Sequence, residues 1–151
     1  MEEKMNLLST LSAPLGRIFI ALIFVISGWN KLFAYTDTQG YMESMGVSGE
    51  LLPFVIGIEL LVGIAVIIGW QTRLAALALA GFSIASALIF HMNLTDQIQF
   101  IMFMKNIAIA GGLLLLVANG PGAYALDNRI GQRNSNNILD IRNGQNEYTN
   151  S

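Results

Sequence analysis

The sequence predicts an all-α membrane protein, a four-transmembrane-helix bundle with both termini cytoplasmic. Hydrophobic residues make up 54% of the chain, charged residues only 12%, and the mean hydropathy is +0.56. Soluble domains carry roughly 25% charged residues, so this composition favours an integral membrane protein. Apolar stretches of about 20 residues, the length that a helix needs to cross a hydrocarbon core, recur along the chain. They cover residues 14–33, 51–69, 73–91 and 98–118.

The sequence also indicates how these helices begin, pack and end. Pro14 suits the first position of the first helix, and no small-residue cleavage site follows that helix to indicate a signal peptide. Gly57 and Gly63 in the second stretch and Gly81 in the third are small residues that let helices approach closely in lipid. The fourth helix is expected to stop at 119–122, Asn-Gly-Pro-Gly, because Gly and Pro end helices.

The distribution of basic residues predicts the topology. The loops at 34–50 and 92–97 contain no Lys or Arg, and the first includes a short amphipathic segment expected to lie at the outer surface. Basic residues occur near the N-terminus, in the turn after the second helix and in the C-terminal tail. They include Lys4, Arg73, Arg129, Arg133 and Arg142. By the positive-inside rule both termini are cytoplasmic, and the two loops face outward.

The connections are too short to hold a second domain. We therefore expect a cytoplasmic N-terminal segment at 1–13, one four-helix membrane domain at 14–127, and a disordered cytoplasmic tail at 128–151. The tail is rich in Asn, Gln, Ser and Gly, a composition that cannot bury enough apolar surface to fold alone.

Several kinds of chemistry are excluded or disfavoured by the composition. The absence of cysteine excludes disulfides, cysteine-bound zinc and iron–sulfur clusters within this chain. The single histidine, His91, excludes bis-histidine haem, and a methionine partner for it is disfavoured because Met usually fills packing gaps. Glu59 and His91 alone would leave a transition metal under-coordinated, so no metal is expected. No basic patch with interleaved aromatic residues indicates nucleic acid.

Two ionisable residues within apolar stretches are the strongest indication of a site. Glu59 lies in the second stretch and Lys105 in the fourth. A charge at membrane depth costs about 2.5–3.5 kcal/mol on insertion scales, so each requires a partner, water or a function. Both helices enter from the outside, which predicts similar depths for the two residues and allows a lateral ion pair. That pair either fixes the helix register or serves as a ligand anchor or proton relay.

Other polar residues should reach the same outer half of the bundle. His91 ends the third helix and is either an interfacial hydrogen-bonding group or a proton donor to a quinone-like head group. Lys31 either extends to the head groups or joins the site. Arg17 and Arg73 are expected to be structural polar residues near the cytoplasmic side, Arg17 with lipid head groups or the last carbonyls of another helix as partners. The ligand-binding or proton-relay candidates are Glu59, Lys105, His91, Asn106, Asn30 and Lys31.

Short motifs in a fixed order resemble those of the DoxX family of small bacterial four-helix membrane proteins. They span roughly residues 14–127, and the chain differs in having Ala125 where such proteins often have Ser. The matching residues are Gly16-Arg17, Ser27-Gly28, Lys31-Leu32, Met45-Gly46, Glu59 with Gly63, Gly69, Thr72-Arg73, His91, Lys105-Asn106, Gly120-Pro121-Gly122 and Leu126-Asp127.

The resemblance implies an inner-membrane subunit or accessory of a quinone-linked oxidoreductase or redox-stress system. It implies no catalytic residue, and the sequence has no self-sufficient catalytic motif. Quinone is the cofactor that this reading allows, and the partners are membrane lipids, an oxidoreductase subunit or another copy of the chain. Two alternatives stay open, a non-enzymatic scaffold or stability factor and a small carrier, although no broken helix or inverted repeat favours a carrier.

Overall fold

The computed structural model describes residues 2–133, and these residues form helices with no strand among them. A 3-10 turn (Gly49–Leu51) precedes α3, a π-helical turn (Ile58–Val62) joins α3 to α4, and a last helix covers 126–133. The tail predicted beyond residue 133, including Arg142, lies outside the described residues. The labelled helices are α1 (Glu2–Phe33), α2 (Tyr35–Ser44), α3 (Leu52–Gly57), α4 (Gly63–Ile68), α5 (Thr72–Phe90) and α6 (Gln97–Asn119).

The predicted fold class is confirmed. Within the described part of the chain, four helical segments are long and apolar enough to cross a membrane, and each overlaps one predicted stretch. They are Thr10–Phe33, Gly49–Ile68, Thr72–Phe90 and Gln97–Asn119. Large apolar side chains are exposed along all four segments, as expected of surfaces that contact lipid acyl chains.

Two local predictions were wrong. Pro14 lies inside α1, which begins at Glu2, because residues 2–13 are mostly good helix formers without Gly or Pro. Residues 128–133 are helical although disorder was expected from residue 128 onwards. The backbone N–H of Asp127 donates to the carbonyl of Gly69 (2.9 Å), which ties the start of that helix to the bundle.

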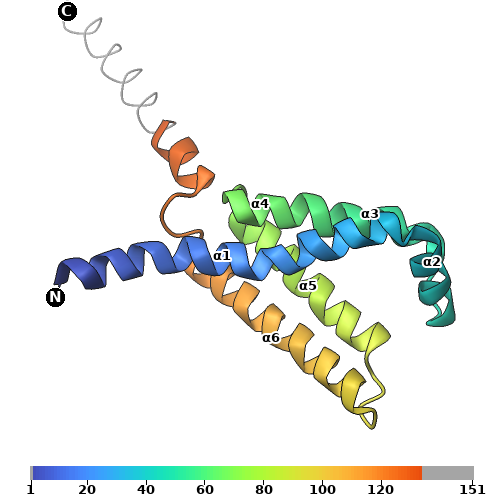
Figure 1. The fold of residues 1–151 in the computed structure, drawn as a ribbon. Helices are drawn as coiled ribbons and strands as arrows, with labels where there is room; N and C mark the ends of the chain where they lie inside the picture. The colour runs from blue at the N-terminus through green and yellow to red at the C-terminus, as the bar shows by residue number, and fades with distance from the viewer. Residues whose placement is uncertain (1, 134–151) are drawn as a thin grey trace, which may run out of the picture.

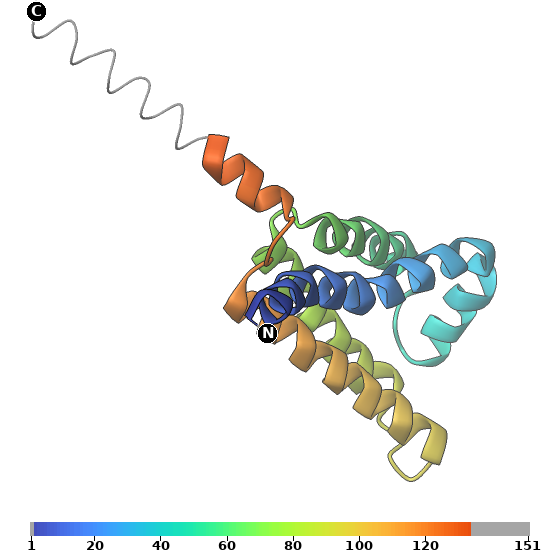
Figure 2. The same cartoon turned by 60° about the vertical axis from the view of Figure 1, so that its left-hand side comes forward.

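The four segments are arranged as two pairs that diverge (Figures 1 and 2). α1 lies beside α3 and α4, and α5 lies beside α6 along its length. The pairs meet at the end of the bundle that holds the turn at 69–71 and the connection at 120–125, which we call the terminal end. They separate toward the end that holds α2 and the connection at 91–96, which we call the loop end.

Small residues form the core where the pairs meet. The buried cluster combines six alanines with four larger side chains, and this composition lets helices pack closely in lipid. Its members are Ala21, Phe24, Ala65, Val66, Ala75, Ala76, Leu79, Ala80, Ala110 and Leu113. Gly63 packs against α1, where a methyl group would come 3.0 Å from Val25. Gly57 and Gly81 have open space beside them, so their predicted packing role was wrong.

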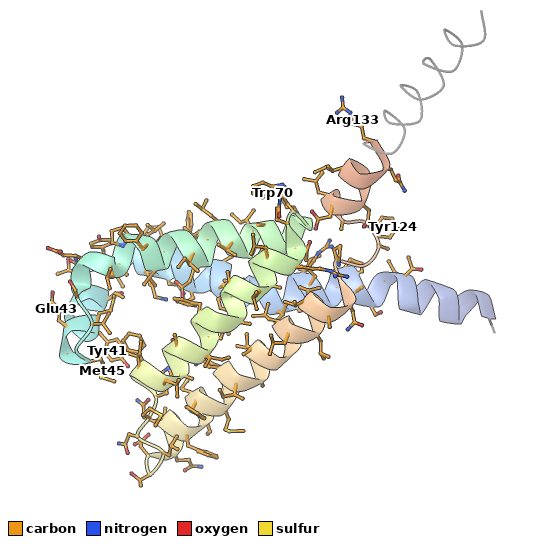
Figure 3. The ribbon with its side chains drawn as sticks, turned by 180° about the vertical axis from the view of Figure 1, so that it is seen from behind. Tyr41, Glu43, Met45, Trp70, Tyr124 and Arg133 are labelled. Carbon is orange, nitrogen blue, oxygen red and sulfur yellow. The ribbon has the colours of Figure 1, made fainter. Side chains whose placement is uncertain are left out.

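A second cluster attaches α2 across the loop end. Met42 is buried against Leu52 and Ile56 of the second membrane span. Tyr41 stacks on Phe90 at the end of α5, with ring centroids 5.6 Å apart. Figure 3 shows Tyr41 on α2 and Met45 directly after α2 at this end, and α2 therefore bridges the two diverging helix pairs.

Candidate functional site

Glu59 lies in the π-helical turn that interrupts the second membrane span. The residue is only 4% exposed, and it is flanked by the apolar residues Ile58 and Leu60. Single π turns inside α-helices occur frequently at functional sites, because the wider turn changes the direction of a side chain relative to its helix. The local backbone is therefore irregular at the most deeply buried carboxylate of the described residues.

Residues of α1 supply the partners of this carboxylate. Lys31 Nζ donates to Glu59 Oε1 at 2.9 Å, and Ser27 Oγ donates to the same oxygen at 3.1 Å. Lys31 Nζ is also 2.6 Å from Ser27 Oγ, the acceptor one helical turn away. Glu59 Oε2 is buried and has no hydrogen-bond partner among the described residues. One carboxylate oxygen thus receives two donors while the other receives none.

Gly28 allows α1 to approach Glu59 this closely. A methyl group at Gly28 would lie 2.9 Å from Leu60 Cγ and 3.0 Å from Glu59 Cβ, closer than real side chains pack. The absence of a side chain between Ser27 and Lys31 on this face is what brings their polar atoms within hydrogen-bond distance of the carboxylate.

The predicted pair of Glu59 and Lys105 was wrong. Lys105 Nζ donates to Met102 Sδ of its own helix at 3.1 Å, and the Lys105 side chain is exposed. α6 packs along α5 and diverges from α3 and α4, so equal depth does not bring the two side chains together. Lys31 ends on Glu59 with 24% of its side chain exposed, instead of extending to the head groups.

A cavity of about 510 Å³ lies between the diverging pairs at the loop end. Five of the six candidate residues line it, namely Glu59, Lys31, His91, Lys105 and Asn106, and Ser27 lines it too. Asn30 is exposed and is absent from the lining. The remaining walls are largely apolar and include Phe24, Met42, Phe54, Val55, Ile58, Phe82, Phe90 and Ile109.

The polar groups of the opposite wall are held by local contacts. His91 Nδ1 lies 2.7 Å from Gln99 Oε1, which connects the end of α5 to the start of α6. Asn106 Nδ2 donates to the carbonyl of Met102 at 3.0 Å. Among residues 10–133, whose side chains the structure describes, no group of three His, Cys, Asp or Glu side chains is suited to a metal ion. The polar groups can donate to and accept from a bound molecule.

A separate polar network joins the helices at the terminal end. Arg17 is buried and donates to the carbonyls of Ile67 (Nε, 3.2 Å) and Pro121 (Nη1, 2.8 Å), so the carbonyl partners expected for it are present. The Asp127 carboxylate accepts from the backbone N–H groups of Gln71 (2.7 Å) and Thr72 (2.9 Å) and from Thr72 Oγ1 (2.8 Å). It thereby caps the start of α5.

The structure also shows the surroundings of Arg73, which was a predicted polar residue, and of Ser27 and Asp127, which were not. Arg73 is exposed, and its guanidinium passes close to Gly120 in the connection after α6. Ser27 and Asp127 were not among the candidates. The sequence signal for Ser27 was its spacing of four residues before Lys31, which places both side chains on one helix face. Asp127 had no local signal, because its partners lie more than 50 residues away.

We expect the Asp127 contacts to make stability depend on pH. Burial alone would raise the pKa of Asp127, but the Thr72 and Gln71 hydrogen bonds and the Arg17 charge hold it below the ordinary value of 3.8. The stabilisation is therefore fully present above about pH 3.8 and is lost as the pH falls through the lower pKa of the folded state.

Thermal unfolding of wild type and Asp127→Asn across pH 3–7 tests this. We expect the variant to be less stable by about 0.5–1.5 kcal/mol near neutral pH, because the amide keeps only one of the two acceptor oxygens and has no charge, with the difference shrinking in acid. A difference that stays constant down to the lowest pH would contradict the assigned role of the carboxylate charge.

Comparisons with known proteins agree with this architecture. The family model described as DoxX matches residues 13–92. The chain is 42% identical over 129 residues to the inner membrane protein YqjF of Escherichia coli K12, covering 85% of this chain and 99% of that protein. It is 34% identical over 122 residues to the inner membrane protein YphA of the same organism, covering 76% and 87%. No solved structure matches the chain significantly. The chain belongs to the DoxX family.

Proposed function

We propose that this protein resides in a bacterial inner membrane and binds a small lipid-soluble molecule, a quinone, in the cavity at the loop end. In this role it acts as a membrane subunit or accessory of a quinone-linked oxidoreductase or redox-stress system. The names of the two relatives support the location. Two observations support a quinone as the ligand, namely the mostly apolar cavity with a few polar groups and the resemblance to the DoxX family.

We further propose that the terminal end faces the cytoplasm. Arg73, Arg129 and Arg133 are exposed near this end, while α2 and the connection at 91–96 contain no Lys or Arg. The positive-inside rule places such a basic end in the cytoplasm. Trp70 and Tyr124, 50% and 71% exposed, suit the interface on the same side (Figure 3).

The observation that carries the proposal is Glu59, a buried residue that lines a mostly apolar cavity and has one carboxylate oxygen without a hydrogen-bond partner among the described residues. Pockets for small molecules are mostly apolar with a few placed polar groups, and this cavity has that composition. Its aromatic and aliphatic walls fit a ring and the start of a tail. Lys31 and Asn106 each keep a further N–H donor for the head-group oxygens, and the ring nitrogen of His91 that does not face Gln99 can hydrogen-bond the ligand.

The residues of this chain bind and orient such a molecule. A bound quinone would supply the capacity to take up and release two electrons together with two protons, in exchange with a partner oxidoreductase. Glu59 and Lys31 fix the position of the head group, and their buried ion pair keeps both side chains in one geometry. α2 covers the cavity through Thr38, Tyr41 and Met42, which limits the access of water to the head group.

A thermal shift with a cavity-blocking variant tests the proposal. A short-chain ubiquinone analogue should raise the melting temperature of purified wild type, because it binds only the folded state and contributes about 2.7 kcal/mol at a concentration 100-fold above Kd. Ala85→Trp places an indole in the lining and should remove most of that rise. Ala78→Trp, two turns earlier on an exposed position of α5 outside the lining, is the matched control and should keep it.

The scaffold alternative predicts a different result. If the cavity is only a packing feature, the analogue raises the melting temperature of none of the three proteins. An equal rise in all three would place the binding elsewhere, on the lipid-facing surface, and would also contradict the proposal.

A further inference from the structure

The two carboxylate oxygens of Glu59 differ in their hydrogen bonds, and this difference indicates which chemical group of a ligand would bind there. Oε1 accepts from Lys31 and Ser27, whereas Oε2 is fully buried without a partner among the described residues. A buried acceptor left unpaired is costly, so molecules that supply a donor to it gain affinity over molecules that cannot. We propose that the ligand of this cavity is recognised through a hydroxyl group that donates to Glu59 Oε2. For a quinone-type molecule this means preference for the reduced quinol form.

The inference rests on the proposed function and goes beyond it, because apolar walls alone would not distinguish the redox forms. A quinone presents only carbonyl acceptors, and placing one beside Oε2 brings two lone-pair-bearing oxygens together. A quinol of the same size presents an O–H donor. Lys31 has three N–H donors and uses two of them on Ser27 and Glu59. The remaining one can donate to the oxygen of the same hydroxyl group.

No hydrogen-bond donor of the described residues reaches Glu59 Oε2, so a ligand hydroxyl would not have to displace one. His91 is engaged with Gln99, Asn106 donates to the carbonyl of Met102, and Lys105 is directed to Met102 Sδ. Among residues 10–133, whose side chains the structure describes, the other buried side-chain atom without a partner is Ser83 Oγ on α5, which does not line the cavity. Ser83 therefore provides a control for the effect of any unpaired buried oxygen.

A series of three probes with one ring and one decyl tail tests the inference on full-length protein in detergent. The probes are a decyl benzoquinol, its oxidised quinone and its dimethyl ether, whose oxygens accept but do not donate. Binding is measured by tryptophan fluorescence and thermal shift under anaerobic conditions, with excess reductant in the quinol samples. The chain has no cysteine, so the reductant has no disulfide to break.

We expect the quinol to bind wild type at least about tenfold more tightly than either the quinone or the ether, the factor that one buried, donor-satisfied acceptor supplies. Glu59→Gln places an amide there, which can both donate and accept, and should reduce the preference to less than about threefold. Ser83→Ala should keep the wild-type preference.

Each result separates the inference from the proposed function. If none of the three probes binds wild type, the proposed ligand class fails and the inference fails with it. If all three bind with equal affinity, the proposed function stands and the role of Oε2 is overturned. If Glu59→Gln folds and retains the preference, another group binds the hydroxyl and the inference is overturned. If that variant does not fold, equal binding of the three probes to wild type still overturns the inference. A preference for the quinol that wild type shows and Ser83→Ala keeps supports it.

Discussion

Lys31→Met should lower the free energy of unfolding by about 3–5 kcal/mol, the cost of removing one partner from a buried ion pair. The reason is the position of Glu59, which is 4% exposed and receives its only cation among the described residues from Lys31 at 2.9 Å. Methionine preserves the length of the aliphatic chain, so the loss reports on the charge and the hydrogen bonds. Equilibrium unfolding in mixed micelles measures it.

Two further variants make this prediction specific. Lys105→Met removes the other lysine of the cavity, and we expect a change of less than about 1 kcal/mol, because that side chain is exposed and is not paired with Glu59. The double variant Lys31→Met with Glu59→Leu should recover much of the lost stability, since apolar replacement of both partners removes the uncompensated charge. A Lys105→Met loss as large as that of Lys31→Met would contradict the assigned pairing.

The double variant also separates stability from ligand binding. If it is stable but does not respond to the quinol or the quinone, the ion pair serves recognition and the bundle can be held by packing alone. If it is stable and responds as wild type does, the polar pair is a structural element and the proposed site role is overturned. Stability and ligand response are thus independent readouts of one residue pair.

The helices could be predicted because hydropathy and length act locally. A run of about 20 apolar residues satisfies its own backbone only as a helix in lipid, whatever its neighbours are. The class of fold follows from four such runs. The extension of α1 to Glu2 was missed because the prediction gave Pro14 more weight than the helix-forming residues before it.

The sequence indicated how far along each helix the candidate residues lie, but not the direction in which their side chains point. Counting residues from the loops placed the candidates in one half of the bundle, and five of them line one cavity, namely Glu59, His91, Lys105, Lys31 and Asn106. It could not show that α6 follows α5 and diverges from α3, which leaves Lys105 away from the carboxylate. Rotation of a helix about its axis depends on packing with its neighbours, and the π-helical turn at Glu59 shifts that rotation further.

The terminal network was beyond sequence reasoning for a different reason. Its contacts join residues that are distant in the chain, such as Arg17 with Pro121 and Thr72 with Asp127. Nothing in the local sequence of Asp127 distinguishes it from a solvated carboxylate. Only the resemblance to the family drew attention to Gly69, Thr72 and Asp127.

Gly69→Ala should lower stability at the terminal end through two separate effects. Gly69 ends α4 with φ of 75° and ψ of 41°, the left-handed region that costs other residues about 1–2 kcal/mol. A methyl group there would lie 2.6 Å from Ala125 Cβ and 2.7 Å from Arg17 Nη1, which adds about 1–3 kcal/mol of overpacking. Moving Arg17 would also weaken its hydrogen bonds to Ile67 and Pro121.

Gly81→Ala is the matched control, because Gly81 lies inside α5 with an ordinary helical environment and nothing within 4 Å of an added methyl group. Alanine is favoured over glycine in a helix interior by about 1 kcal/mol, so this variant should be as stable as wild type or more so. Thermal unfolding of both variants beside wild type gives the comparison. Equal stability of the two alanine variants would mean that the connection at 120–125 does not pack tightly against the end of α4. The helices at the terminal end would then be held together by the buried core cluster alone.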